Sequence, residues 1–214
     1  MDRRHFLETL AAGLLTVSCT MPVRQSMPGP SPIPVERDEK GLTPLSRFFV
    51  TAIVSFPPKI DIETQLLKID GAIDHPYEVT YTELEQMPQN VQESVLQCVG
   101  GASGRARWKG VKIRALLERA GVQAGAKDVV FYGADEYESS IPYATAVKSS
   151  SMLALQMNDE LLQPKHGAPL RVVLPGIYGY KQVKWLTGIK VVQKNHKGYW
   201  EQRGYSDDGT IRSK

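Results

Sequence analysis

The residue with the clearest potential for chemistry is Cys98. It follows the strand-like residues 95–97 and precedes Val99-Gly100-Gly101, and the other of the two cysteines, Cys19, lies close to the N-terminus. Glycines allow positive φ and let a ligand approach the backbone, so the thiol is presented at a bend. This placement suits a metal ligand or a nucleophile, although a lone free cysteine can also be a small buried hydrophobe.

Basic residues gather in two further segments, residues 105–112 and residues 181–197. These segments could be solvated surface, which is the usual meaning of a run of charge. They could equally receive a phosphorylated cofactor, because guanidinium forks and ammonium groups are the usual donors to phosphate. The net charge of +3 over 214 residues is small, so the composition gives no reason to expect a nucleic-acid partner.

Length and composition indicate one globular domain behind a processed leader. Hydrophobic residues make up 42% and charged residues 23% of the chain, which is ordinary for a globular protein with a proper core. The chain has no internal repeat, and it lacks the Gly-x-Gly-x-x-Gly, phosphate-loop and haem-attachment motifs.

The N-terminus is close to the twin-arginine export pattern. Asp2-Arg3-Arg4-His5-Phe6-Leu7 precedes a mildly apolar run, residues 10–17, which is too short to span a bilayer comfortably. We expect residues 1–19 to be a signal peptide that exports the folded protein to the periplasm. The alternative is a basic start followed by an amphipathic turn.

Cys19 follows Leu15-Thr16-Val17-Ser18, which resembles a lipoprotein cleavage box with Thr where Leu is usual. If Cys19 carries lipid, the Pro-rich residues 20–42 form an extended tether between membrane and domain. If it does not, the leader is simply removed nearby. Both outcomes stay open, and a disulfide between Cys19 and Cys98 is not expected because one belongs to the leader.

The remaining chain alternates short strands with short helices. Residues 82–85, Thr-Glu-Leu-Glu, have the form of a capping box that opens a helix. A second helix is predicted by one apolar face and a terminal Gly121, the face being Ile113, Leu116, Leu117 and Ala120. The predicted strands are residues 66–71, 128–132, 152–157, 170–174 and 189–192. We therefore expect an α+β domain with mixed β-sheets and short helices.

Four segments in this order resemble the molybdopterin domain of the sulfite oxidase superfamily, including its periplasmic methionine-sulfoxide-reductase branch. They are Cys98 with its glycines, Arg107-Trp108-Lys109-Gly110-Val111, His166-Gly167-Ala168-Pro169-Leu170-Arg171 and residues 175–185. The resemblance extends from about Thr43 to Gly209 and implies an oxidoreductase domain at residues 43–214 with the family's α+β fold.

The resemblance implies a cofactor with one molybdenum held by a single pyranopterin dithiolene. Cys98 matches the cysteine whose thiolate completes the sulfur ligation of the metal, which suits a soft ligand. The other implied cofactor-binding residues are Phe49, Val50, His166, Arg171, Gln182, Val183 and Lys184. For residues 182–184 the family contacts are the backbone and the lysine. Trp108 and Trp185 are expected to pack, with the substrate funnel as the alternative.

The resemblance also bears on the substrate. Sulfite-oxidising relatives place arginines just after the metal-binding cysteine and after the Phe-Phe-Val stretch, whereas residues 99–103 and 51–53 contain none here. We expect two-electron oxygen-atom transfer on a small molecule other than sulfite, with a membrane quinol-linked or cytochrome subunit as electron partner.

Two other classes of protein remain open. A metal-free periplasmic binding or scaffolding module could retain the fold. A thiol enzyme could use Cys98 as nucleophile with a base among His75, His166 and His196.

Overall fold

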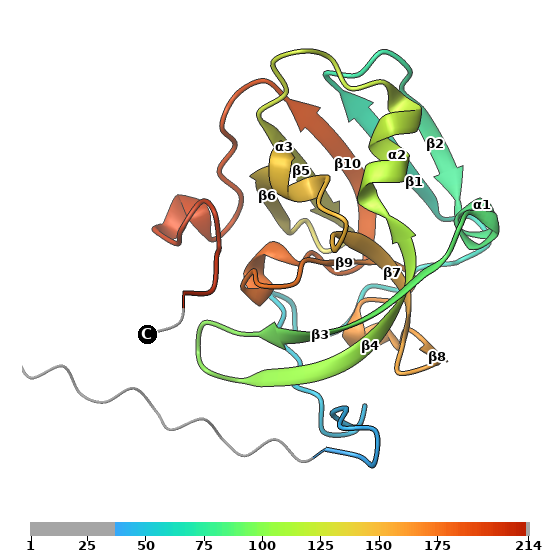
Figure 1. Ribbon diagram of the computed structural model, residues 1–214, viewed down its shortest axis with the longest axis vertical. Coiled ribbons are helices and arrows are strands. Elements are labelled where there is room, and N and C mark those ends of the chain that lie inside the picture. Colours follow the sequence, from blue (N-terminus) through green and yellow to red (C-terminus); the bar gives the residue numbers. More distant parts are fainter. Residues whose placement is uncertain (1–36, 213–214) are drawn as a thin grey trace, which may run out of the picture. The chain divides into compact units, whose positions relative to one another are not determined.

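Two β-sheets organise the chain (Figure 1). A computed structural model describes residues 37–212, so the expected signal peptide, Cys19 and most of the expected linker lie outside the described residues. The first sheet has five strands in the order β2 (Tyr77–Thr80), β1 (Leu66–Gly71), β10 (Leu186–Val192), β5 (Asp128–Gly133) and β6 (Glu138–Pro142). β1 and β10 are parallel, whereas the other pairs are antiparallel.

The second sheet is antiparallel throughout. Its strands are β3 (Asn90–Gln97), β4 (Ser103–Lys112), β7 (Met152–Met157), β8 (Glu160–Leu161) and β9 (Arg171–Val173), the last pairing with β7. β7 is apolar on both faces: Leu153 and Leu155 enter one core, and Met152 and Ala154 enter a second. The sequence of β7 is almost continuously hydrophobic because the strand is buried on both faces.

The helical elements are short. They are α1 (Tyr81–Gln86), α2 (Ile113–Ala120) and α3 (Tyr143–Ala146), with 3-10 turns η1 (Pro164–His166), η2 (Gly179–Lys181) and η3 (Glu201–Arg203). Within residues 37–212, no helix has the length and apolar character needed to cross a membrane. The expected α+β architecture of mixed sheets and short helices is confirmed.

Helix α2 is as the sequence predicts. All four residues of its expected apolar face are buried in the larger core. Gly121 ends the helix with φ of 67° and donates its N–H to Glu118 O. This left-handed position is one that glycine adopts without the steric cost that a side chain adds.

Helix α1 exists, but the expected capping box was wrong by two residues. Thr80 Oγ1 accepts a hydrogen bond from Glu83 N at 3.2 Å, and Glu83 accepts one from Thr80 N at 2.8 Å. Thr82 and Glu85 have the same spacing, so the local pattern could not choose between the pairs. Burial decides it, because a helix starting at Tyr81 directs both Tyr81 and Leu84 into the core.

Of the expected strands, residues 66–71 and 152–157 agree with β1 and β7. β5 and β10 are longer than the expected strands 128–132 and 189–192, and β9 is shorter than the expected strand 170–174. The longest strand that was not predicted from the sequence is β4, whose residues were interpreted as a basic segment and as one of the segments of the family resemblance. Its side chains alternate between partly exposed Arg105 and Arg107 and buried Ala106 and Trp108. This period of two is typical of a strand with one buried face.

Candidate active site

Cys98 lies in the turn between β3 and β4. Its N–H donates to Ala102 O at 2.7 Å, and Gly101, with φ of 96°, donates to Cys98 O at 3.0 Å. The thiol is free and half-buried, and it lines a pocket of about 300 Å³. The turn therefore presents the sulfur to a cavity of the size that small ligands occupy.

The pocket gathers segments that are distant in the sequence. It is bounded by residues 49–53, by the β3–β4 turn, by the segment around η1 and β9, by η2 with the residues that follow it, and by part of the C-terminal segment. Every predicted cofactor-binding residue lines it, namely Phe49, Val50, Cys98, His166, Arg171, Gln182, Val183 and Lys184. The structure thus brings the predicted residues together, while their contacts with a cofactor stay a prediction.

Arg171 is a buried cation at the start of β9. Its Nη1 donates to His166 O at 3.0 Å, and its guanidinium lies 5.1 Å from the ring centroid of Trp108. Burial lowers the pKa of Arg171 to about 10, so the side chain stays charged at neutral pH. Within residues 37–212 its Nε has no hydrogen-bond partner and no carboxylate forms an ion pair with it. Arg171 can therefore donate to an anion in the pocket.

Lys184 adds a second cation to the pocket. Its Nζ donates to Lys165 O at 3.3 Å and lies 4.2 Å from the ring centroid of Trp185. Burial and, to a smaller extent, the nearby charge of Arg171 together lower the pKa of Lys184 to about 8, against the opposing effect of Asp135. An anion placed between Lys184 and Arg171 would relieve this repulsion.

The backbone next to Lys184 is held in an unusual conformation. Trp185 has φ of 52°, a left-handed conformation that costs a bulky residue on the order of 1–3 kcal/mol. Its indole N–H donates to Pro164 O at 2.7 Å, and its backbone N–H donates to Gly167 O at 3.3 Å. Trp185 and Trp108 are both buried and neither lines the pocket, which agrees with the expected packing roles.

His166 and Gln182 contribute differently from the two cations. His166 Nε2 lies 3.4 Å from Leu45 O, and burial lowers the pKa of His166 to about 4, so the ring is neutral at neutral pH. The amide of Gln182 is occupied by Leu174 N at 3.2 Å, Leu174 O at 3.2 Å and Ile177 O at 2.8 Å. Its side chain shapes the loop, which agrees with the prediction that backbone contacts a ligand here.

Sequence reasoning missed one part of the pocket. Tyr137, Tyr180, Trp200 and Tyr205 also line it. For Trp200 and Tyr205 a usable signal was the aromatic content of residues 199–205. Of the histidines considered as a base for Cys98, His166 lines the pocket, whereas His75 and His196 do not.

Comparisons with known proteins identify the family. The family described as "Oxidoreductase molybdopterin binding domain" matches residues 54–200. The chain is 34% identical over 140 residues to "Uncharacterized oxidoreductase YuiH" of Bacillus subtilis, covering 65% of this chain and 71% of that protein. This chain therefore belongs to the oxidoreductase molybdopterin binding domain family, and it is a molybdopterin-binding oxidoreductase of the sulfite oxidase superfamily.

Other relatives are longer than this chain. "Putative protein-methionine-sulfoxide reductase subunit YedZ1" of Azospira oryzae is 32% identical over 148 residues, covering 69% of this chain and 56% of that protein. "Sulfite oxidase, mitochondrial" of Drosophila melanogaster is 32% identical over 195 residues, covering 78% of this chain and 34% of that protein. The crystal structure of the sulfane dehydrogenase SoxCD from Paracoccus pantotrophus matches with a TM-score of 0.68 at 24% identity, covering 72% of this chain and 44% of that chain. This last similarity concerns the fold.

The residues of the pocket fit a molybdopterin cofactor. The buried, unpartnered Nε of Arg171 and the ammonium of Lys184 suit an anionic group. The thiol of Cys98 in the same pocket suits a soft metal. The donor set thus contains both a sulfur ligand and anion-binding groups.

Proposed function

We propose that this protein is an exported molybdenum enzyme that transfers an oxygen atom, with two electrons, to or from a small substrate other than sulfite. The observation that carries the proposal is the convergence of the Cys98 thiol with Arg171 and Lys184 on one pocket. When bound, a molybdenum atom held by one pyranopterin dithiolene supplies the redox chemistry. The protein's own residues would bind and position the cofactor and the substrate.

The roles of the residues follow from their environments. Cys98 would ligate the metal through its thiolate, and Arg171 and Lys184 would bind the anionic and pterin parts of the cofactor. His166 stays neutral and, with Phe49, Val50 and Val183, bounds the site. Gln182 fixes the loop through its amide. This arrangement positions the cofactor before substrate arrives, so little reorganisation is needed during reaction.

The lining near Cys98 supports a substrate other than sulfite. Thr51, Ala52, Ile53, Val99 and Gly100 all line the pocket, and none carries a positive charge. A site for a small dianion needs charged forks beside the reacting centre. The lysine and arginine residues that do line the pocket are Lys165, Arg171 and Lys184, which lie in or directly before the segments expected to hold the cofactor.

The proposal includes export and a partner. The twin-arginine pattern at Arg3-Arg4 favours transport of a folded, loaded protein to the periplasm, and Cys19 is a candidate lipid anchor. Electrons would pass to or from a separate membrane quinol-linked or cytochrome subunit. Full turnover by the purified chain with a quinol and no second protein would contradict that partner.

The proposal is tested by measuring metal content. Protein exported through its own leader should contain about one molybdenum per chain by elemental mass spectrometry. A Cys98→Ser variant should lose the metal or change its electronic spectrum, because the soft ligand is replaced. Val99→Ala is the matched control, since it alters the same turn without touching a sulfur atom.

Absence of molybdenum under conditions that load a control enzyme would overturn the oxidoreductase mechanism. Alkylation of Cys98 by iodoacetamide, with loss of activity in that metal-free protein, would then identify a thiol enzyme. Binding of a partner without any such activity would identify a metal-free binding module.

A further inference from the structure

Part of the pocket lining comes from a C-terminal wall, which we define as residues 199–205. Trp200 and Tyr205 of this wall line the pocket together with Tyr180 of η2. The Trp200 and Tyr205 ring centroids are 4.9 Å apart, and those of Tyr180 and Tyr205 are 5.2 Å apart. Three half-buried aromatic rings therefore present one continuous surface to the cavity.

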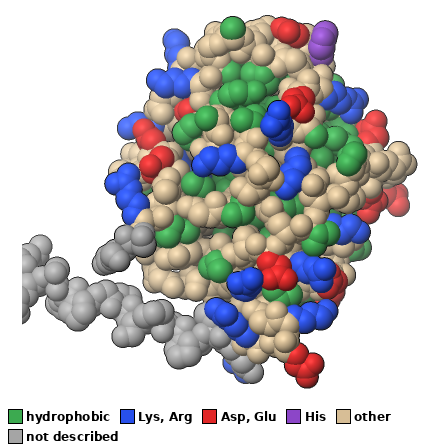
Figure 2. Space-filling model, in the orientation of Figure 1, with side chains coloured by type: hydrophobic (Ala, Val, Ile, Leu, Met, Phe, Trp, Pro, Cys, Tyr) green, Lys and Arg blue, Asp and Glu red, His purple; other side chains and the backbone are tan. Residues whose placement is uncertain are grey.

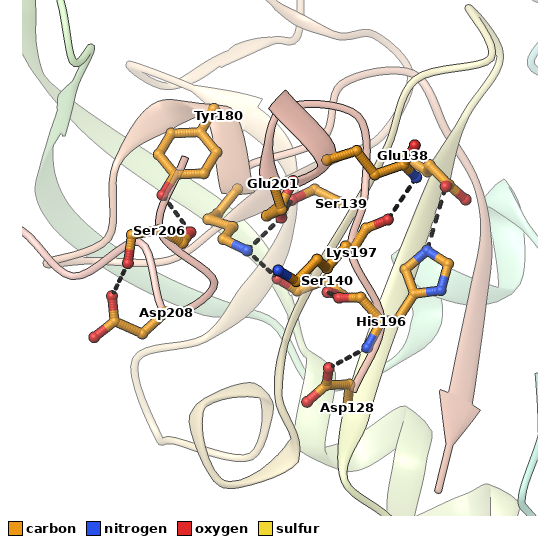
Figure 3. Close-up of polar contacts among 12 residues, drawn as sticks. Asp128, Glu138, Ser139, Ser140, Tyr180, His196, Lys197, Glu201, Ser206 and Asp208 are labelled. Carbon is orange, nitrogen blue, oxygen red and sulfur yellow. Dashed lines mark hydrogen bonds and ion pairs between the residues drawn. The ribbon is translucent and has the colours of Figure 1, made fainter. Parts of the chain in front are cut away.

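A buried ion pair lies behind this aromatic surface. Lys181 and Glu201 form a salt bridge with no exposed side-chain area on either partner. Lys181 Nζ also donates to Ser140 O at 2.8 Å, and Ser139 Oγ donates to Glu201 Oε1 at 2.6 Å. Figure 3 shows these contacts joining η2, β6 and the C-terminal wall.

The ion pair controls the position of the aromatic rings through chain connectivity. Lys181 directly follows Tyr180, and Glu201 directly follows Trp200. The Tyr180 hydroxyl also donates to Ser206 O at 2.6 Å, beyond the end of the wall (Figure 3). A movement of either partner of the pair would therefore displace a ring that lines the pocket.

The wall is also attached to the edge of the first sheet. Tyr199 N donates to Glu138 O at 3.0 Å, and the C-terminal segment, red in Figure 1, runs beside β6. Gly198 permits this contact, because a Cβ there would lie 2.5 Å from Glu138 O. The wall is thus fixed both at its start and behind its rings.

The chemistry of the wall limits what it can bind. Its pocket-facing rings carry no formal charge, and the apolar side chains of Val50, Ile53 and Val99 line the same pocket. A cationic group would be repelled by Arg171 and Lys184, which line the same cavity. On the face shown in Figure 2, basic and acidic side chains are interspersed, so no field of one sign dominates there. An uncharged group with apolar surface is what these residues accommodate.

We propose that the C-terminal wall determines substrate specificity by binding an uncharged, apolar or aromatic group attached to the reacting centre. Trp200, Tyr205 and Tyr180 contact that group, and Lys181 and Glu201 are positioning residues that hold the rings in place. This proposal rests on the proposed oxidoreductase function and extends it to a class of substrate.

Two neutral probes that differ in one group test the contact. Methyl phenyl sulfoxide and dimethyl sulfoxide are titrated into the purified, metal-loaded enzyme by calorimetry. The phenyl compound should bind about tenfold more tightly, because its ring buries additional apolar surface. Trp200→Ala should remove most of this preference, whereas Tyr132→Ala, an aromatic side chain outside this pocket, should retain it. Equal affinities for both probes in the native enzyme would overturn the proposal.

The positioning role of Lys181 and Glu201 is tested by measurements that a general loss of stability would not alter. Glu201→Gln keeps the shape of the side chain but removes its charge. It should reduce the ratio of the two affinities and shift Trp200 fluorescence to longer wavelength as that ring becomes solvated. The pair variant Lys181→Met with Glu201→Leu guards against misfolding, because it removes both buried charges. An unchanged affinity ratio and spectrum in a folded Glu201→Gln variant would exclude the positioning role.

The metal content of each sample distinguishes a failure of the proposed oxidoreductase function from a failure of the specificity proposal. If molybdenum is absent, the proposed function fails, whatever the probe preference. If molybdenum is present and the two probes bind equally, only the specificity proposal fails.

Discussion

Two segments that line the pocket differ in how firmly the rest of the fold holds them. The N-terminal strap, which we define as residues 48–60, forms no hydrogen bond with any part of the described chain. Its side chains are largely outside the core: Val50 is 50% exposed and Phe56 is 83% exposed. The C-terminal wall, in contrast, is tied down by a fully buried ion pair and by backbone hydrogen bonds.

The strap depends on one aromatic anchor. Phe48 is buried, stacks on Phe49 and packs edge-on against Trp108 and His166. Beyond Phe49 the strap has few packed contacts, so it should open locally at a lower free energy than the wall. This pocket therefore combines a wall of fixed geometry with an adaptable strap.

The largest expected effect concerns the ion pair of the wall. Lys181→Met alone should lower the free energy of unfolding by about 3–5 kcal/mol, because it leaves the Glu201 carboxylate buried without a counter-charge. Chemical denaturation monitored by circular dichroism measures the change. Lys181→Met combined with Glu201→Leu is the control and should recover much of the loss. A Lys181→Met protein of native stability would show that the wall is not fixed by this pair.

A smaller effect should follow from disturbing the anchor of the strap. A Cβ at Gly104 would lie 2.5 Å from the Phe48 ring, so Gly104→Ala should displace Phe48 and cost about 1–3 kcal/mol. Proteolysis within the strap should accelerate, and this can be followed by mass spectrometry of the fragments. Gly100→Ala is the matched control, because its added Cβ meets only the Cys98 sulfur at 3.9 Å. Equal cleavage rates in both variants would contradict the role of Phe48.

The cations between the two sides should give a pH-dependent effect of intermediate size. The pKa of Lys184 is lowered to about 8, so its charge is lost as the pH rises through that value. Sulfate, whose charge is constant over this range, should therefore bind the cofactor-free protein about tenfold more weakly at pH 9 than at pH 7. Thermal shift measurements at several sulfate concentrations check this.

Two further expectations follow from the same shift. Lys184→Gln should remove most of the pH dependence and leave the binding due to Arg171, whose pKa is about 10. Without sulfate, the contribution of Lys184 to the stability of the fold should rise between about pH 8 and pH 10.5, because the unfolded chain binds more protons there. Sulfate binding that is equally strong at pH 7 and pH 9 would show that Lys184 does not take part.

The smallest effect is expected at the exposed part of the strap. Phe56 is 83% exposed, so Phe56→Ser should change the free energy of unfolding by less than about 0.5 kcal/mol. Denaturation under the conditions used for Lys181→Met gives a direct comparison. A loss of more than about 2 kcal/mol, the size expected for a core substitution, would mean that the strap is as firmly packed as the wall.

Features that depend on neighbouring residues could be predicted from the sequence, whereas features that depend on contacts between distant segments could not. Helix α2 was predictable because its apolar spacing and Gly121 act within one segment. The cap of α1 was not, because Thr80 and Thr82 are locally equivalent and only the burial of Tyr81 and Leu84 separates them. The alternation of basic and apolar residues in β4 was present in the sequence, but the basic residues were interpreted as a charged segment, so the strand was not predicted.

The site shows the same division. Cys98, Arg171 and Lys184 could be identified through motifs, and the structure places them around one cavity. The pairing of Lys181 with Glu201 could not be foreseen, because nothing in the local sequence says that η2 and η3 meet. That contact depends on how the C-terminal segment crosses β6, which is a property of the whole fold.

The position of β10 in the first sheet limits how early the domain can fold during its synthesis. β10 lies between β1 and β5, yet among the described strands it is the last in the chain, and the wall that lines the pocket follows it. A nascent chain therefore cannot close this sheet or complete this cavity until residues 186–205 have been synthesised. A ligand that contacts Cys98, Arg171 and the wall together can bind only after these distant segments have folded onto one another.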